Sequence, residues 1–252
     1  MVKDTEFCAL ILAAGKGTRM KSDMAKVLHV LNGEPLLYYS IAAARKAGAQ
    51  KIIVIVGHQS DKVKEAFPDP DLIFVEQRPQ LGTGHAVMQA REALEGYRGL
   101  TVILCGDVPL LKTSTIRSLI KIHQDAQVPV TVLTTEPPGP HAYGRIVKND
   151  EGDILKIVEH RDATDAERNI LEINTGIYCV DTPFLFAALA QVKNDNQQKE
   201  YYLTDIVEIA RREGRTVHAF LTGDYVEVMG INTLEELQKA GEYLRQSSTG
   251  QV

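Results

Sequence analysis

A cationic, glycine-containing loop near the N-terminus has the residue types that bind phosphate. The stretch LILAAGKGTRM runs from a hydrophobic segment into Gly15 and Gly17, with Lys16 and Arg19 beside them, and Lys26 follows soon after. Glycines let backbone N–H groups approach phosphate oxygens, and arginine can bind a phosphate through two parallel hydrogen bonds. The loop therefore predicts an anion site. A turn whose cations are merely solvated is the alternative.

Two common phosphate-binding motifs do not fit this loop. A Walker A loop requires four residues between its glycines, whereas only Lys16 separates Gly15 from Gly17. The dinucleotide-binding fingerprint requires a third glycine where this chain has Met20. Other segments must therefore indicate which anion binds.

Asp107 has the position of a metal-binding carboxylate. It directly follows the apolar segment LTVILC and Gly106, and open α/β sheets bind ligands at the carboxyl ends of their strands. A hard oxygen ligand there suits Mg²⁺, which keeps several waters and is completed by substrate phosphates. An aspartate that caps the next segment is the alternative. Asn232 precedes a helical pattern and by itself predicts a helix N-cap.

A second glycine-containing loop, EQRPQLGTGHA, separates a predicted strand from a predicted helix. The Gln77 amide offers a donor and an acceptor side by side, which match the imide edge of uracil. Taken alone, the loop is more typical of a capped turn. His85, His160 and the other histidines lack metal-ligand spacing, which favours surface or capping roles.

The hydrophobic pattern predicts the elements that position these loops. Strands alternate with amphipathic helices over the first half of the chain, which is typical of βαβ units with right-handed crossovers and a mainly parallel sheet. A predicted β-hairpin at 144–160 breaks this alternation, and we expect it to cover the substrate site. Thr113 is the expected cap of one helix, and Asn232 or Thr233 that of the last. The expected strands are 8–14, 51–57, 71–77, 100–107, 128–135, 174–180 and 216–222, and the expected helices are 35–48, 60–67, 84–96, 113–124, 183–192, 201–214 and 232–246.

Composition limits the class of protein. The 252 residues are 44% hydrophobic and 24% charged, which is ordinary for a globular protein with a substantial core. A net charge of −5 argues against a general nucleic-acid or anionic-membrane surface. Cys8, Cys105 and Cys179 lie in separate apolar segments, which predicts buried thiols in a reducing compartment. With no signal-peptide pattern and no segment of transmembrane length, the sequence predicts a cytoplasmic protein.

The motifs also occur in the order of a known family. The segment LAAGKGTRMKSDMAKVLH resembles the signature of the sugar-phosphate nucleotidyltransferases. The segments EQRPQLGTGHAV, LCGDVPLL, AYGRIV, IVEHRDAT, EINTGIY and KEYYLTDIV are similar, in the same order, to the uridylyltransferase (pyrophosphorylase) domain of bifunctional N-acetylglucosamine-1-phosphate uridylyltransferase/glucosamine-1-phosphate acetyltransferases. The similarity runs from about Cys8 to Asn232, nearly the whole chain.

This resemblance implies a Rossmann-like α/β nucleotidyltransferase fold, with a mainly parallel mixed sheet flanked by helices and a small β-hairpin insertion over the sugar site. The family's bifunctional members continue into a left-handed β-helix domain, which we do not expect in this chain. Because the chain has no hexapeptide repeat, we expect neither acetyl transfer nor the family's trimer, but a monomer or weak oligomer. We expect a single nucleotidyltransferase domain at 5–246, with a nucleotide-binding part at about 5–112, a sugar-binding part at about 113–232, a C-terminal helix at about 233–246 and a frayed tail at 247–252.

The implied reaction joins UTP and N-acetylglucosamine 1-phosphate into UDP-N-acetylglucosamine and pyrophosphate, by in-line attack on the α-phosphate with Mg²⁺. No nucleic acid or membrane partner is implied. By resemblance, Arg19 and Lys26 are catalytic, and Asp107 and Asn232 hold the metal. The implied nucleotide-binding residues are Leu12, Ala13, Ala14, Gly15, Gly17, Thr18, Arg19, Lys26, Gln77, Gln80, Gly82 and Thr83, and the implied sugar-binding residues are Gly144, Glu159, Asn174, Glu200, Tyr202 and Thr204.

Three positions depart from the family pattern. Ala25 replaces the usual proline before the lysine, which predicts a looser Lys26 loop. Cys105 stands where a tyrosine often precedes Gly-Asp, and Lys199 stands where glycine often precedes Glu-Tyr-Tyr, which puts a cation beside the sugar site. Two other functions stay open: a nucleotidyltransferase for another sugar 1-phosphate or nucleotide, and a non-catalytic nucleotide-sugar binding protein.

Overall fold

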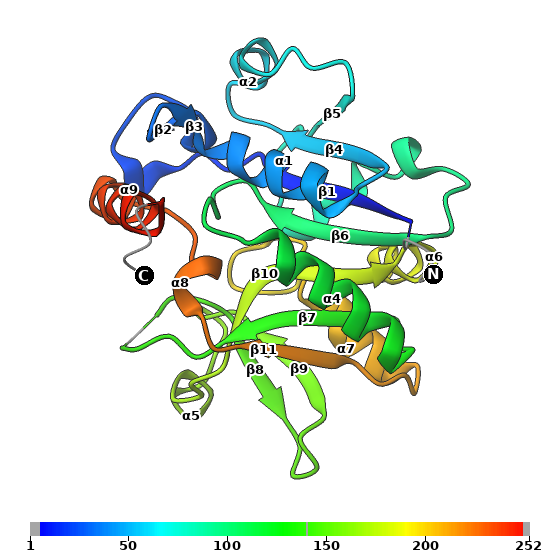
Figure 1. Ribbon diagram of the computed structural model, residues 1–252. Coiled ribbons are helices and arrows are strands. Elements are labelled where there is room, and N and C mark those ends of the chain that lie inside the picture. Colours follow the sequence, from blue (N-terminus) through cyan, green and yellow to red (C-terminus); the bar gives the residue numbers. More distant parts are fainter. Residues whose placement is uncertain (1–5, 140, 249–252) are drawn as a thin grey trace.

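A mixed β-sheet forms the centre of the molecule (Figure 1). The computed structural model describes residues 6–139 and 141–248. Its central sheet contains β1 (Phe7–Ala13), β4 (Lys51–Val56), β5 (Leu72–Glu76), β6 (Leu100–Cys105), β7 (Val130–Thr135), β8 (Arg145–Lys148), β9 (Ile154–Val158), β10 (Ile173–Asp181) and β11 (His218–Thr222). The seven strands expected outside the hairpin and both strands of the predicted hairpin are therefore present, and the expected mainly parallel mixed sheet is confirmed.

The strand order brings the loops of interest to one edge. The main path runs β11-β7-β10-β6-β1-β4-β5, and β8 and β9 extend from β10 as a hairpin. β1 is parallel to β4 and β6, β4 to β5, and β7 to β11, whereas β10 is antiparallel to both β6 and β7. The carboxyl ends of the parallel strands and the amino end of β10 therefore share one edge, on the left in Figure 1.

Helices cover both faces of the sheet, which explains the uninterrupted apolar strands. α1 (Leu36–Ala47) and α4 (Thr113–Ala126) lie in front in Figure 1, and α6 (Thr182–Leu189) and α7 (Asp205–Arg212) lie behind. Along β1, Leu10 packs in the core cluster that includes α6 and α7, while its neighbour Ile11 packs in the cluster that includes α1 and α4. Successive strand residues point to opposite faces, so both must be apolar.

Two predicted helices differ from the structure. The expected helix 84–96 is α3 (Thr83–Met88) followed by the 3₁₀ turn η3 (Glu92–Leu94), because the N–H groups after Met88 bond three residues back. The expected helix 201–214 begins only at Asp205. Its first turn is lost because Tyr201 pairs with the second glycine loop, donating its N–H to the Leu81 carbonyl at 2.8 Å and accepting from the Gly84 N–H at 2.8 Å.

The hydrogen bonds at the helix N-termini show which of the predicted caps form. Thr113 is the first residue of α4 and makes no side-chain cap, so that prediction is wrong. Before α9 (Leu234–Ser248), the Thr233 hydroxyl accepts the Glu236 N–H at 3.2 Å, and Glu236 Oε2 accepts the Thr233 N–H at 3.1 Å. This is a capping box, which leaves the Asn232 side chain available for other contacts.

The C-terminal helix packs on a small hairpin that the sequence analysis missed. This hairpin is β2 (Val30–Leu31) and β3 (Glu34–Pro35), and Asn32 at its turn bonds the Gly241 carbonyl at 3.3 Å. Of the tail that we predicted to be frayed, residues 247 and 248 belong to α9, and 249–252 lie outside the described residues. In the described part of the chain, no helix is long and apolar enough to span a membrane.

Candidate active site

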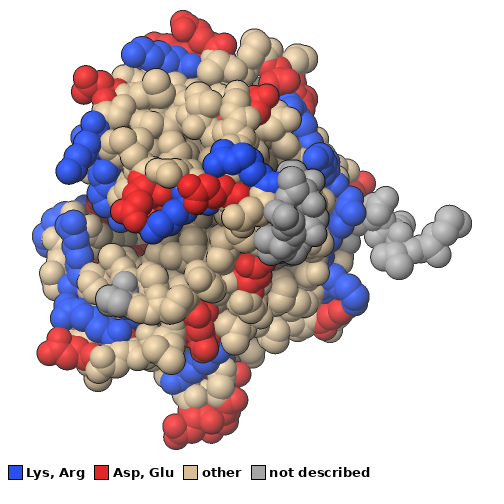
Figure 2. All heavy atoms as spheres, turned by 60° about the vertical axis from the view of Figure 1, so that its left-hand side comes forward, with Lys and Arg blue, Asp and Glu red and all other residues tan. Residues whose placement is uncertain are grey.

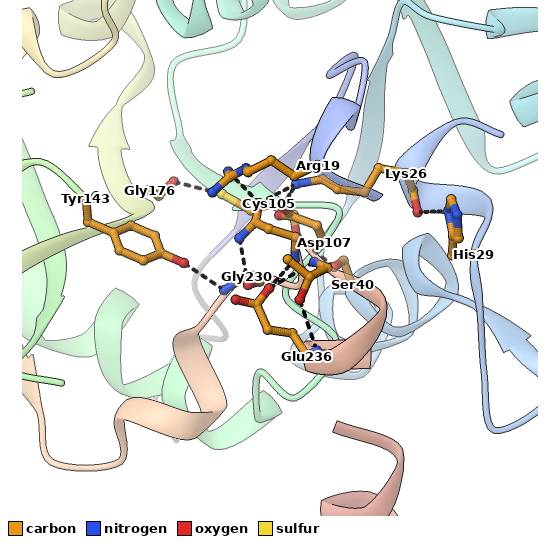
Figure 3. A network of polar contacts seen from close by, with 12 residues as sticks. Arg19, Lys26, His29, Ser40, Cys105, Asp107, Tyr143, Gly176, Gly230 and Glu236 are labelled. Carbon is orange, nitrogen blue, oxygen red and sulfur yellow. Dashed lines mark hydrogen bonds and ion pairs between the residues drawn. The ribbon is translucent and has the colours of Figure 1, made fainter. Parts of the chain in front are cut away.

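Four side chains from three distant segments meet at the carboxyl edge of the sheet (Figure 3). Asp107 follows β6, Arg19 and Lys26 belong to the 3₁₀ turns η1 (Thr18–Met20) and η2 (Lys26–Leu28), and Asn232 precedes α9. The Lys26 ammonium pairs with Asp107 Oδ2 and donates to Asn232 Oδ1 at 3.1 Å. Arg19 Nη2 donates to the same Asn232 oxygen at 2.8 Å. The predicted catalytic and metal residues are therefore in direct contact.

Backbone contacts bring Asn232 to Asp107. The Ile231 N–H donates to the Asp107 carbonyl at 2.8 Å, and the Gly230 N–H donates to the Tyr143 hydroxyl at 3.3 Å. A Cβ on Gly230 would lie 3.2 Å from Asp107 Oδ2, so glycine allows this close approach. Figure 3 shows Tyr143 reaching Gly230 from the other side of the site. The C-terminal segment is thus held from two directions.

The Lys26 turn is packed against the first glycine loop. Gly17 has a φ of 63°, and a Cβ there would lie 2.6 Å from Lys26 Cβ, so only glycine fits. His29 donates from Nδ1 to the Lys26 carbonyl at 3.1 Å. The loop backbone and the lysine side chain are therefore positioned together.

Gln59 holds the segment that contains Ala25 through two hydrogen bonds. The Ala25 N–H, which a proline would lack, donates to Gln59 Oε1 at 3.0 Å, and Gln59 Nε2 donates to the Asp23 carbonyl at 2.7 Å. These two bonds clamp the segment that leads into Lys26. The looser loop that we expected from Ala25 stays a prediction, and these bonds give the segment partners that do not depend on proline.

The oxygen atoms at this site suit a hard divalent cation. Asp107 Oδ2 and Asn232 Oδ1 both contact one cationic nitrogen, that of Lys26, so a single cation can meet both oxygens. Within the described residues, no group of three or more His, Cys, Asp or Glu side chains could enclose a metal. The protein therefore offers two oxygen ligands, and Mg²⁺ commonly accepts such a site because water and substrate phosphates complete its shell.

A cavity of about 500 Å³ adjoins this cluster. Its lining includes Arg19, Asp107 and Asn232 of this cluster, together with Gly144, Glu159 and Asn174. Figure 2, which turns the left-hand edge of Figure 1 forward, shows acidic and basic side chains mixed on this face. Half of the predicted sugar-binding residues therefore line a cavity that the predicted metal ligands share.

The other predicted sugar-binding residues are not among those that line this cavity. The Tyr202 hydroxyl donates to Asp162 Oδ2 at 3.0 Å and accepts from Gln198 Nε2 at 2.8 Å, and its side chain is buried. Thr204 donates to Glu159 Oε1 at 3.2 Å. Neither these residues nor Glu200 lines the cavity, so their contacts hold neighbouring groups in place.

The other two departures from the family pattern also have structural consequences. Cys105 lines the cavity, and its Sγ lies 3.5 Å from the Gly176 carbonyl. Burial and the nearby Asp107 carboxylate raise the pKa of Cys105 to about 12, so its thiol stays protonated. Lys199 has a φ of 55°, a conformation that glycine adopts freely. Its side chain is exposed.

The predicted nucleotide residues form two linked loops. Gly15 is exposed, and a Cβ there would contact nothing, so its backbone is open to a ligand. Gln80 donates to the Ala14 carbonyl, which ties the second loop to the first. Gly82 has a φ of 104° and a Cβ there would lie 2.6 Å from the Tyr201 carbonyl, so glycine is required.

The remaining predicted nucleotide residues have different environments. Leu12 and Ala13 end β1, and Thr18 is exposed in η1. Thr83 Oγ1 accepts the Leu203 N–H at 3.1 Å, and Gln77 is buried, with 5% of its surface exposed.

Sequence reasoning missed three residues that hold this site. Tyr143 had a signal, since it directly precedes Gly144 in the AYGRIV segment. His29 and Gln59 had none, because their roles depend on which backbone groups the fold brings near them.

Residues 9–242 match the MobA-like NTP transferase domain family. The chain belongs to this family. Bifunctional protein GlmU of Geotalea daltonii is 51% identical over 238 residues, which are 94% of this chain and 52% of that protein. The protein of the same name from Bacillus licheniformis is 44% identical, with the same shares covered. The chain therefore spans about half the length of these curated relatives.

Solved structures agree on the fold of this family member. UDP-glucose pyrophosphorylase complexed with UDP-glucose superposes with a TM-score of 0.76 at 19% identity, over 96% of this chain and 99% of that chain. The apo form gives a TM-score of 0.77 at 18% identity. At such identities the likeness concerns the fold alone. It confirms the expected Rossmann-like nucleotidyltransferase fold.

The Gln59 clamp generates a prediction. Gln59→Ala removes the acceptor of the Ala25 N–H, so hydrogen exchange of residues 21–28 should become faster and turnover should fall several-fold. Adding Ala25→Pro should reverse both effects, because Ala25 has a φ of −54°, which proline matches. Mass spectrometry measures the exchange.

Gln127→Ala is the matched control, since Gln127 has a similar φ of 51° but ends α4 away from the loop. Unchanged exchange at 21–28 in Gln59→Ala would contradict the clamp.

A cluster of carboxylates around Asp205 generates a pH prediction. Burial, followed by repulsion from Glu208, Glu159 and Asp162, raises the pKa of Asp205 from 3.8 to about 6. The folded state thus holds this proton more tightly than the unfolded state, so the charged form costs stability above pH 6 and costs nothing below pH 3.8. Asp205→Asn should raise the free energy of unfolding at pH 7.5 by roughly 1 kcal/mol after allowance for solvent screening. Urea unfolding of the variant and the wild type at pH 7.5 and 4.5 measures this difference in free energy, which should be smaller at pH 4.5. An equal gain in stability at both pH values would contradict the raised pKa of Asp205.

Proposed function

We propose that this chain is a uridylyltransferase that joins UTP and N-acetylglucosamine 1-phosphate into UDP-N-acetylglucosamine and pyrophosphate. The observation that carries the proposal is the contact of Arg19, Lys26, Asp107 and Asn232 at the rim of a cavity lined by sugar-compatible polar groups. The similarity to GlmU proteins over most of the chain also supports it.

The reaction needs no covalent enzyme intermediate. A phosphate oxygen of the sugar phosphate attacks the α-phosphorus of UTP, the bond from this phosphorus to the oxygen shared with the β-phosphate breaks, and pyrophosphate leaves. The attacking phosphate is already ionised near pH 7, because the second pKa of a phosphomonoester is about 6. The site therefore needs positioning and charge stabilisation rather than a general base.

The two cations act on the triphosphate. Arg19, whose side chain is exposed, binds phosphate oxygens and the leaving pyrophosphate. Lys26 exchanges its Asp107 partner for phosphate oxygens, and the open backbone of Gly15 adds N–H donors. Asp107 and Asn232 would hold Mg²⁺, which would supply positive charge beside the reacting phosphates.

Each half of the chain binds one of the two substrates. Residues up to about 112 supply the loops for UTP, and residues from about 113 to 232 supply the sugar site. Gly144, Glu159 and Asn174 hold the sugar hydroxyl and acetamido groups in the cavity. Thr204 orients the Glu159 carboxylate through its 3.2 Å hydrogen bond.

A substrate matrix tests the proposal. Pyrophosphate release is measured with Mg²⁺ and UTP, dTTP, CTP, ATP or GTP, each with N-acetylglucosamine 1-phosphate, glucose 1-phosphate or N-acetylgalactosamine 1-phosphate. We expect release to be fastest with UTP and N-acetylglucosamine 1-phosphate, and to be lost in Asp107→Ala. If release were fastest with another nucleotide or another sugar phosphate, the assignment of UTP or of N-acetylglucosamine 1-phosphate as the substrate would be wrong. UDP-sugar binding without release from any pair would make the chain a nucleotide-sugar binding protein.

Lys26→Ala and Arg19→Ala should each lower turnover by about 100-fold or more, because each removes a charged donor from the triphosphate. The fold should persist, since neither side chain belongs to the apolar core clusters. Circular dichroism and steady-state kinetics measure the two properties. Lys121→Ala, which removes an exposed helix lysine, is the matched control. Near-normal turnover in a catalytic variant would remove that residue from the mechanism.

A further inference from the structure

The Gln77 amide has both of its N–H hydrogens engaged within the protein. Its Nε2 lies 2.9 Å from the Gly82 carbonyl and 3.1 Å from His85 Nδ1. The side chain is 5% exposed, so an unpaired amide hydrogen there would be costly. This geometry changes the initial interpretation, in which Gln77 offered the base both a donor and an acceptor.

The orientation of this amide follows from its partners. A carbonyl oxygen only accepts hydrogen bonds, so the Gln77 atom facing Gly82 must be the nitrogen. The nitrogen has a second hydrogen, and His85 Nδ1 is the atom placed to accept it. Gln89 Nε2 lies 3.3 Å from the other ring nitrogen, His85 Nε2, but a neutral imidazole accepts at only one nitrogen. We assign the acceptor to Nδ1, whose contact is the shorter one at 3.1 Å, so the ring hydrogen is on Nε2 and the Gln89 contact at Nε2 is not a hydrogen bond. Burial lowers the pKa of His85, which favours the neutral ring that can accept in this way.

The imidazole itself is held by its surroundings. Gln89 Nε2 donates to the His85 carbonyl at 3.0 Å, and the Tyr201 ring lies 6.2 Å from the imidazole ring. His85 belongs to α3, whose N-terminal end is fixed by the Gly84 N–H bond to Tyr201. His85 Nδ1 therefore belongs to a helix, α3, whose position is fixed by backbone hydrogen bonds.

One atom of the Gln77 amide then remains for a ligand. Its Oε1 has no hydrogen-bond partner among the residues that the structure describes. A lone acceptor suits a base edge with a donor. Uracil and thymine carry a hydrogen on N3, whereas N3 of cytosine is itself an acceptor and would face this oxygen unpaired.

We propose that His85 is a positioning residue for base selection: by accepting the second Gln77 hydrogen, it keeps Oε1 toward the base and selects pyrimidines that have a hydrogen on N3. The inference rests on the proposed function for the presence of a nucleotide beside Gln77. His85 acts through Gln77 and does not itself contact the base.

Two substitutions of His85, one that keeps a hydrogen-bond acceptor and one that removes it, separate this role from simple packing. In His85→Asn, the Oδ1 atom can take the place of Nδ1 as an acceptor, whereas His85→Leu has similar volume and no acceptor. We expect His85→Leu to lower the UTP-to-CTP ratio of kcat/KM at least tenfold, mainly through a higher KM for UTP. His85→Asn should keep this ratio within about threefold of the wild type. The UTP-to-dTTP ratio should stay unchanged in both, because both bases have a hydrogen on N3.

The outcomes distinguish this inference from the proposed function. Equal UTP-to-CTP ratios in the Asn and Leu variants would assign His85 to packing and overturn the inference. A wild type without preference for UTP over CTP would overturn both the uridylyltransferase assignment and the inference.

A spectroscopic readout needs no substrate. Long-range ¹H–¹⁵N correlation spectra of the ligand-free protein at pH 7.5, assigned with His85→Asn, should show His85 Nδ1 without a hydrogen. A protonated Nδ1 would overturn the inference and leave the proposed function standing.

Discussion

A backbone hydrogen bond of 2.8 Å, from the Ile231 N–H to the Asp107 carbonyl, joins the C-terminal part of the chain to the end of β6. Together with the Gly230–Tyr143 hydrogen bond, it places Asn232 beside Asp107, although the two residues are far apart in the sequence. In the capping box, Thr233 and Glu236 form the hydrogen bonds that the first N–H groups of α9 need. The Asn232 side chain is not required for this cap. The amide oxygen of Asn232 is therefore free to meet the cations of the N-terminal loops.

These loops can reach Asp107 because of the strand order. β1 lies beside β6 in a parallel pair, so the glycine loop that follows β1 begins next to the turn that contains Asp107. The Gly106 N–H donates to the Leu12 carbonyl at 2.9 Å and continues this pairing beyond the strand. Lys26 then neutralises Asp107 at a partly buried site, where an unpaired carboxylate would be costly. In the proposed reaction, this pair opens when phosphates supply new partners for the lysine.

The sequence predicted those parts of the fold that depend on local pattern. Apolar strands such as KIIVIV indicated a sheet buried on both faces, and Gly48 indicated the end of α1, which the structure confirms with a φ of 100°. Contacts between distant segments were beyond such reasoning. Tyr201 and its neighbours carry a helical pattern, yet the pairing of Tyr201 with the Leu81 loop keeps Tyr201 out of the helix, which begins only at Asp205. The site shows the same limit. Motifs could select Asp107 and Lys26 by type, but the support from Gln59 and His85 depends on a single carbonyl, N–H or amide that only the folded chain brings near.

The central claim is that one site joins the metal ligands Asp107 and Asn232 to the phosphate-binding cations and the sugar cavity. Crystals grown with UDP-N-acetylglucosamine and Mn²⁺, measured for anomalous scattering from manganese, test it most directly. The account predicts one manganese peak in contact with both Asp107 and Asn232, the product phosphates beside Lys26 and Arg19, and the sugar against Glu159 and Asn174. A manganese peak away from Asp107, or a sugar outside the cavity with Gln77 far from the base, would contradict it.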